Sequence, residues 1–125
     1  LIVDDDQDIL NLVAKMVSRL GYHATATADP VDALLRLADT PYDMVISDYA
    51  MPRMDGYQLA DQIREKHFGT KIIIMTGHRD PDLIDLLQHS GIVDGLLFKP
   101  FTVDTLKEKL QLAEDSYVRR QAIGP

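Results

Sequence analysis

The chain has 125 residues, of which 46% are hydrophobic, so one domain with a single core is expected. Disulfides and thiolate metal sites are excluded because there is no cysteine. No apolar run approaches the ~18 residues of a membrane span, and no signal peptide is visible, which fits a cytoplasmic protein. The formal net charge is −7, which disfavours direct binding of nucleic acid, a polyanion held through Lys and Arg.

Short apolar runs alternate with helical patterns along the whole chain. Strands are predicted over residues 1–3, 22–28, 43–48, 71–76 and 95–98. Helices are predicted over residues 9–20, 30–38, 57 to about 69, 81 to about 90, and 103–117. The alternation predicts an α/β fold, a doubly wound (βα)5 domain with a five-stranded parallel sheet and helices on both faces.

Several helix starts carry clear capping signals. Asp29-Pro30 and Asp80-Pro81 each place a capping acid before a proline at the first helical position. Val31, Leu34, Leu35 and Ala38 then carry the apolar pattern of the second helix. Asp6 is well placed to cap the first helix, which explains one of three consecutive acids by structure alone.

Polar side chains stand where four of the predicted strands end. Asp4 and Asp5 follow the first strand, Asp48 ends the third, Thr76 ends the fourth and Lys99 follows the fifth. In an open α/β sheet these ends share one edge, where ligands bind at the topological switch point. We therefore expect three carboxylates, a hydroxyl and an ammonium to converge.

Three neighbouring carboxylates need a counter-charge. At 4 Å each pair repels by about 4 kcal/mol for an effective dielectric near 20. Lys99 supplies one positive charge, and an all-oxygen site open to water suits Mg²⁺, which supplies two more. Such a set of groups can handle phosphate, with a carboxylate as the nucleophile that forms an aspartyl phosphate.

The motifs together resemble the receiver domain of bacterial two-component response regulators, of the chemotaxis-receiver type. The matching motifs are Val3-Asp4-Asp5, Ser47-Asp48, Met51-Pro52, Asp55-Gly56, Met75-Thr76-Gly77 and Lys99-Pro100-Phe101. The resemblance implies the flavodoxin-like strand order 2-1-3-4-5. It also implies a phosphorelay module that is not an enzyme in its own right, beyond catalysing its own phosphorylation and dephosphorylation.

The resemblance assigns a role to each acid of the cluster. It implies that Asp48 accepts a phosphoryl group from a histidine kinase or a histidine phosphotransfer domain. Asp5, Asp48 and the backbone carbonyl of Ala50 would bind Mg²⁺, with Mn²⁺ as a substitute. Asp4 would act largely through a bound water.

The resemblance also assigns the residues that respond to the phosphoryl group. Thr76 and Lys99 would contact it, with Thr76 swinging inward as the switch and the Lys99-Pro100 bond cis. Family members usually carry Tyr or Phe where this chain has Leu96, so Leu96 is expected to present a small apolar patch to a partner. The face of the fourth helix, fifth strand and fifth helix would then contact an output domain or a target, or form a homodimer.

Two alternatives to this interpretation can be weighed from the sequence. Asp4-x-Asp6 superficially matches a small Mg²⁺-dependent phosphohydrolase of the haloacid-dehalogenase type, with Asp4 as nucleophile, although the chain has no room for the usual cap. A receiver that ignores phosphate would need a broken set of acids, whereas the set in this chain is complete. We assign residues 1–117 to the receiver domain and 118–125 to a C-terminal helix end or linker, and we expect native residues before Leu1.

Overall fold

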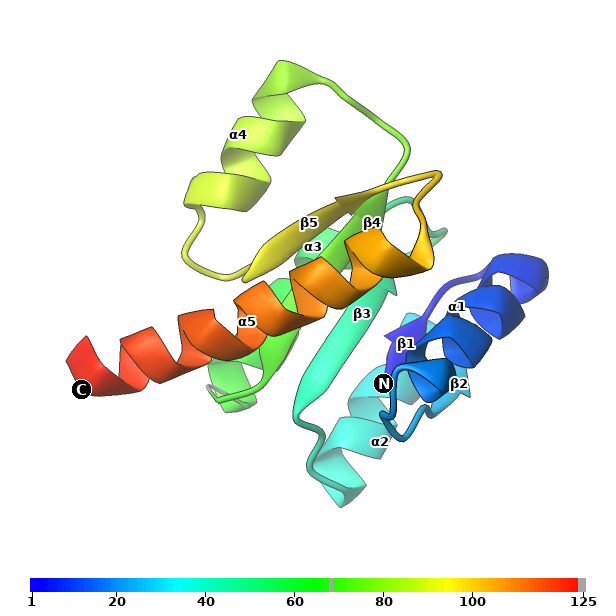
Figure 1. The fold of residues 1–125 in the computed structure, drawn as a ribbon, viewed down its shortest axis with the longest axis horizontal. Coiled ribbons are helices and arrows are strands. Elements are labelled where there is room, and N and C mark those ends of the chain that lie inside the picture. The colour runs from blue at the N-terminus through cyan, green and yellow to red at the C-terminus, as the bar shows by residue number, and fades with distance from the viewer. Residues whose placement is uncertain (68, 124–125) are drawn as a thin grey trace.

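Five short strands form one parallel sheet in the computed structural model, which describes residues 1–67 and 69–123 and, within residues 116–123, the backbone alone. The elements in chain order are β1 (Ile2–Val3), α1 (Gln7–Arg19), β2 (Ala26–Thr27), α2 (Pro30–Asp39), β3 (Met44–Asp48), α3 (Gly56–Lys66), β4 (Lys71–Thr76), α4 (Pro81–His89), β5 (Gly95–Phe98) and α5 (Val103–Ile123). The strand order is β2-β1-β3-β4-β5 (Figure 1). The predicted (βα)5 fold and its order 2-1-3-4-5 are confirmed.

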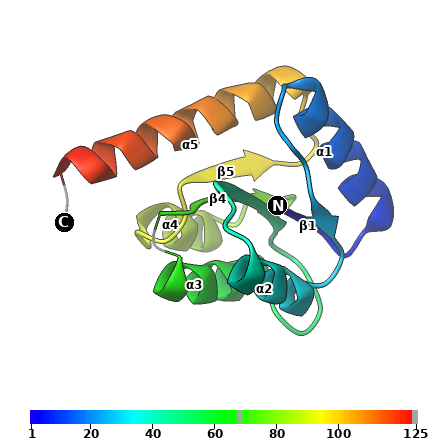
Figure 2. The ribbon, with the colours of Figure 1, turned by 90° about the horizontal axis from the view of Figure 1, so that it is seen from below.

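Helices cover both faces of the sheet. Figure 2 shows α1 and α5 on one side and α2, α3 and α4 on the other. Successive side chains of a strand point to opposite faces, so Ile72 of β4 joins the core under α2–α4 while Ile73 joins the core under α1 and α5. β4 is therefore apolar on both faces, as a central parallel strand requires.

The predicted helix caps are present. Asp6, Asp29 and Asp80 are the N-caps of α1, α2 and α4, and each side chain accepts a hydrogen bond from a backbone amide of the first turn. Pro30 and Pro81 occupy the first turn of their helices. Within the described residues, no helix is both long enough and apolar enough to cross a bilayer.

The strand predicted over residues 22–28 is shorter than expected. β2 lies at the edge of the sheet and pairs with β1, where Ile2 meets Ala26 and Val3 meets Thr27. Thr25 contributes only its carbonyl, which accepts a hydrogen bond from the backbone N of Ile2 at 2.8 Å, and residues 22–25 are not part of the strand. The helix predicted over residues 103–117 lies within α5, whose side chains are described up to residue 115.

A buried ion pair joins three segments at the end of the sheet where β4 begins, opposite to the end that carries Asp48. Arg64 Nη2 of α3 lies 3.1 Å from Asp94 Oδ2, and the two side chains are 10% and 0% exposed. The same oxygen accepts a hydrogen bond from the backbone N of Ile72 at 2.7 Å. Arg64 also donates to the carbonyls of Thr70 and Ile92, each at 2.7 Å. This pair ties α3, the start of β4 and the segment before β5 together.

Candidate functional site

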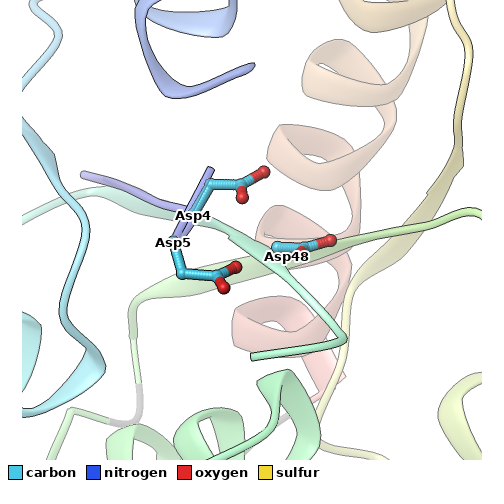
Figure 3. A group of neighbouring side chains, drawn as sticks. All are labelled: Asp4, Asp5 and Asp48. Atoms are coloured by element: carbon cyan, nitrogen blue, oxygen red, sulfur yellow. The ribbon is translucent and has the colours of Figure 1, made fainter. Parts of the chain in front are cut away.

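The register of the sheet places Asp4 beside Asp48. Val3 of β1 is paired with Ser47 of β3, so the residues that follow them stand at the same height at the carboxyl ends of two adjacent strands. Carboxylate oxygens of Asp4, Asp5 and Asp48 all lie within 4.8 Å of one another (Figure 3). Asp4 is fully buried, Asp48 is 7% exposed and Asp5 is open to solvent.

Lys99 lies between two of these acids. Its Nζ donates to Asp48 Oδ1 at 2.8 Å and to Asp4 Oδ2 at 3.2 Å. It directly follows β5, whose last residue, Phe98, is paired with Thr76 of β4. The Lys99-Pro100 peptide bond is cis, as the resemblance implies.

The local electrostatics favour a proton or a cation on Asp48. Burial raises the pKa of Asp48, and the hydrogen bond from Lys99 offsets this in part, while the charge of Asp4 adds to the rise. Burial alone lowers the pKa of Lys99, but its hydrogen bond to Asp48 and the charges of both acids outweigh that effect and the pKa rises. Lys99 therefore stays charged, and one ammonium serves more than one carboxylate.

The three acids fit a hard divalent cation. All the donors are oxygen atoms, and the exposure of Asp5 leaves one side of the cluster open to water. Mg²⁺ takes oxygen ligands and keeps several of its waters, so it needs few protein ligands and an open side. Ala50, whose carbonyl is the further predicted ligand, lies in the exposed loop two residues beyond Asp48.

A glycine allows the loop after β3 to fold back on Asp48. The backbone N of Gly56 donates to the carbonyl of Tyr49 at 2.7 Å. A Cβ on Gly56 would lie 2.5 Å from the backbone oxygen of Asp48, which no side chain can tolerate. Asp55, which precedes it, is the N-cap of α3 and forms a capping box with Gln58.

Thr76 stands at the same edge of the sheet, one strand further along. Its side chain is buried at 1% exposure, and Oγ1 accepts a hydrogen bond from the backbone N of His78 at 3.0 Å. The backbone N of Lys99 donates to the carbonyl of Thr76 at 2.9 Å. The structure thus brings Asp4, Asp5, Asp48 and Lys99 into one cluster, with Thr76 held to Lys99 by backbone pairing.

Leu96 is buried and does not form part of an exposed patch. It is 5% exposed and belongs to the core under α2–α4. The prediction that Leu96 presents a small apolar patch to a partner is wrong, because β5 pairs with β4 and α4 covers this face of the strand.

Two residues near the site were missed in the sequence. The guanidinium carbon of Arg79 lies 4.5 Å from the centroid of the Phe98 ring. Phe98 could have been found by alternation, because it follows Leu96 by two residues on the same face of β5 and directly precedes Lys99. Arg79 carries no such signal, because a loop has no period.

Asp6 caps α1 and does not take the part of the second catalytic acid that the phosphohydrolase hypothesis requires. Its Oδ1 accepts hydrogen bonds from the backbone N atoms of Asp8 and Ile9 at 3.0 and 3.3 Å. Asp4, the nucleophile of that hypothesis, accepts from the backbone N of Asp6 and pairs with Lys99. Asp6 therefore serves the helix, and the hypothesis is left without its second acid.

The family model for the response regulator receiver domain matches residues 1–111. The chain belongs to the response regulator receiver domain family. Receiver domains of this family carry the (βα)5 fold seen here, and the acidic cluster at the strand ends agrees with the membership.

Named relatives of this receiver domain include regulators and kinases. It is 38% identical over 107 residues to transcription factor SKN7 of Candida albicans, covering 85% of this chain and 19% of that protein. It is 37% identical over 112 residues to the sensor histidine kinase RcsC of Escherichia coli K12, covering 90% of this chain and 12% of the kinase. The chain thus spans less than a fifth of either relative.

Solved structures agree with the fold. The signal receiver domain of an HD domain-containing protein from Pseudomonas fluorescens Pf-5 is 30% identical, with a TM-score of 0.85 and 95% of each chain covered. The chemotaxis response regulator CheY4 of Vibrio cholerae is 29% identical, with a TM-score of 0.82 and coverage of 90% of this chain and 94% of that one.

Proposed function

We propose that this receiver domain is a phosphoacceptor in a two-component phosphorelay and that Asp48 carries the phosphoryl group. One observation carries the proposal: Asp48 ends a central strand, beside two other carboxylates, with the Lys99 ammonium 2.8 Å away. An ammonium and a cation site beside a single carboxylate suit the transfer of an anionic phosphoryl group to that carboxylate.

Each residue of the cluster has a role in the transfer. A carboxylate oxygen of Asp48 forms the bond to phosphorus while the bond from phosphorus to the donor imidazole nitrogen breaks, and that nitrogen keeps the electron pair. Lys99 and the Thr76 hydroxyl hold the phosphoryl oxygens. Asp5, Asp48 and the Ala50 carbonyl would hold the metal, with Asp4 acting through water. Bound there, Mg²⁺, or Mn²⁺ in its place, would supply positive charge against the phosphoryl oxygens.

The donor and the output follow from the same proposal. The donor is the phosphohistidine of a histidine kinase or of a histidine phosphotransfer domain in the cytoplasm. Phosphorylation shifts the domain toward a second conformation of the face formed by α4, β5 and α5, which contacts an output domain, a target protein or a second copy. The phosphoryl group biases this equilibrium only through its different contacts in the two states. The domain does not bind nucleic acid directly.

Intact-mass measurement tests the proposal. We expect incubation with acetyl phosphate and Mg²⁺ to add one phosphoryl group, and EDTA to prevent the addition. Asp48→Asn should abolish it, because an amide is not a nucleophile here. Asp55→Asn is the matched control, since asparagine still caps α3 and the variant should be phosphorylated normally.

The same variants distinguish a phosphoacceptor from the alternative, a phosphohydrolase. Sustained turnover of a generic phosphate ester, lost in Asp4→Asn and kept in Asp48→Asn, would overturn the phosphoacceptor proposal in favour of a phosphohydrolase. Transfer from a phosphorylated histidine phosphotransfer domain to wild type, and not to Asp48→Asn, supports the phosphorelay.

A further inference from the structure

The loop that follows β4 makes a side-chain contact with the end of β5. Arg79 lies in this exposed loop, three residues after Thr76, and its guanidinium carbon is 4.5 Å from the Phe98 ring centroid. A cation over the face of an aromatic ring at this distance is attracted by the ring quadrupole. The contact joins a segment with few backbone restraints to a paired strand.

Both the backbone and the side chain of Phe98 are held in place. Its backbone is paired in register with Thr76, and its ring packs against the core under α2–α4. The next residue, Lys99, has its Nζ bound to Asp48 and Asp4. The ring is therefore held in place, one residue before the lysine that binds the acidic cluster.

Leu96 occupies the position on β5 where family members usually have an aromatic residue. A leucine there cannot change its contacts in response to a movement of Thr76. It is buried, apolar and without a polar group that could follow the Thr76 hydroxyl. Phe98 lies two residues further along the same face of β5 and closer to the site. In this chain the aromatic residue of β5 therefore stands two positions closer to Lys99 than Leu96 does.

We propose that Arg79 and Phe98 form a latch that holds the loop after β4 in its unphosphorylated position and releases it when Asp48 is phosphorylated. The proposal rests on the proposed function of Asp48. We define the Arg79–Phe98 latch as the contact between this guanidinium and this ring. It takes the place of the aromatic swing that Leu96 cannot make.

The hydrogen bonds of Thr76 give the coupling a route. Thr76 Oγ1 accepts from the backbone N of His78, and its own hydroxyl hydrogen remains able to donate to a phosphoryl oxygen. When Thr76 moves toward Asp48, it draws His78 and its neighbour Arg79 along, while Phe98 stays in its strand. The latch then exists in one state and not in the other, which is the differential contact that a switch needs.

Nuclear magnetic resonance can observe the latch directly. An aromatic ring moves the resonances of protons above its face upfield, so the Arg79 side-chain protons should be shifted upfield in the free protein. The shift should be absent in Phe98→Leu. Adding beryllofluoride and Mg²⁺, which mimic the acyl phosphate, should remove it in wild type and leave it unchanged in Asp48→Asn.

Variants measure what the latch contributes to the switch. Removing it should lower the beryllofluoride concentration at half-saturation about two- to five-fold, the range expected for an exposed cation–π contact. Phe98→Leu removes the ring without changing charge, and Arg79→Gln removes the cation. The double variant should change no more than either single one, because both remove the same contact. Phe101→Leu is the matched control, since Phe101 packs against the core under α1 and α5.

The outcomes separate the latch from the function on which it rests. Loss of the upfield shift with beryllofluoride, together with non-additive variants, supports the latch. If the Asp48 and Thr76 amide resonances move but the Arg79 shift persists, the latch is overturned and the phosphoacceptor stands. If the single effects add, or Phe101→Leu matches Phe98→Leu, the latch is likewise overturned. If no Asp48 resonance responds, the phosphoacceptor proposal falls and the latch falls with it.

Discussion

Lys99 Nζ donates a hydrogen bond of 2.8 Å to Asp48 Oδ1, although the two residues are 51 positions apart in the chain. The same nitrogen reaches Asp4 Oδ2 at 3.2 Å. Asp48 ends β3, and Asp4 follows the adjacent strand β1. Lys99 follows β5, so its ammonium reaches across β4 to contact both acids. The site is therefore assembled by the order of the strands, and its charge balance depends on Lys99.

Replacing Lys99 with methionine should destabilise the metal-free protein. The side chain keeps its length but leaves two buried acids without their cation, so we expect the free energy of unfolding to fall by about 2 kcal/mol. Urea denaturation in EDTA measures this. Lys107→Met, on an exposed position of α5, is the control and should have little effect. A loss no larger than that of the control would mean that Lys99 does not stabilise the cluster.

Mg²⁺ should stabilise the folded protein through the acidic cluster. A ligand that binds the native state at a hundredfold excess over its Kd adds about 2.7 kcal/mol to the free energy of unfolding. Asp5→Asn should remove most of this gain because it deletes an exposed oxygen charge from the site. Asp8→Asn, an exposed acid in the first turn of α1, should keep the gain. Thermal denaturation with and without Mg²⁺ measures both, and equal gains in the two variants would contradict the assignment of Asp5.

The raised pKa of Asp48 predicts a pH dependence of stability. A carboxyl whose pKa is higher in the folded state than its ordinary 3.8 holds its proton more tightly when folded. Its contribution to stability is therefore present below that ordinary value and is lost as the pH rises through the folded pKa. Asp48→Asn lacks this loss, so without metal it should match wild type near pH 3 and be more stable by about 1 kcal/mol at neutral pH.

Urea denaturation from about pH 3 to about pH 8 in EDTA measures the difference between Asp48→Asn and wild type. Saturating Mg²⁺ should reverse its sign, because the metal binds the ionised carboxylate and cannot use the amide in the same way. A difference that does not change with pH would show that the ionisation of Asp48 does not affect folding.

Gly56→Ala should damage the site through the backbone. The added Cβ would sit 2.5 Å from the Asp48 oxygen and 2.9 Å from the Tyr49 Cα, so the loop must move. We expect a loss of about 2 to 3 kcal/mol in the free energy of unfolding and slower phosphorylation by acetyl phosphate. Gly77→Ala is the matched control for stability, because a Cβ there has nothing within 4 Å. Equal stability of the two variants would contradict the close approach.

Local signals in the sequence were sufficient for most elements. The Asp-Pro pairs at 29–30 and 80–81 predicted two helix starts that the structure confirms, because capping and the proline ring act within one turn. The strand over 71–76 was predicted to the residue, since Ile72 to Met75 is apolar on both faces. Local chemistry decides these features.

Periodicity failed in part where packing against another element decides which residues are buried. Of the apolar residues predicted for α2, Leu34 packs against the core, but Val31 and Leu35 are 44% and 66% exposed. Ala33 and Leu37 are buried instead. Ala33 and Leu37 belong to the core under α2–α4 because the packing of α2 sets which of its sides is buried, and the sequence does not encode that packing. The strand over 22–28 shrank to Ala26–Thr27 for the same kind of reason, since pairing with β1 sets its length.

By itself, the sequence determined which residues end the strands. It therefore determined that Asp4, Asp5, Asp48, Thr76 and Lys99 belong to one edge of a parallel sheet, because strand ends and caps follow from chemistry between near neighbours. The tertiary structure alone decided the pairs of Lys99 with two acids, of Arg64 with Asp94 and of Arg79 with Phe98. Each of these contacts joins residues from different elements, and its distance depends on how the sheet and helices pack, which no local pattern records.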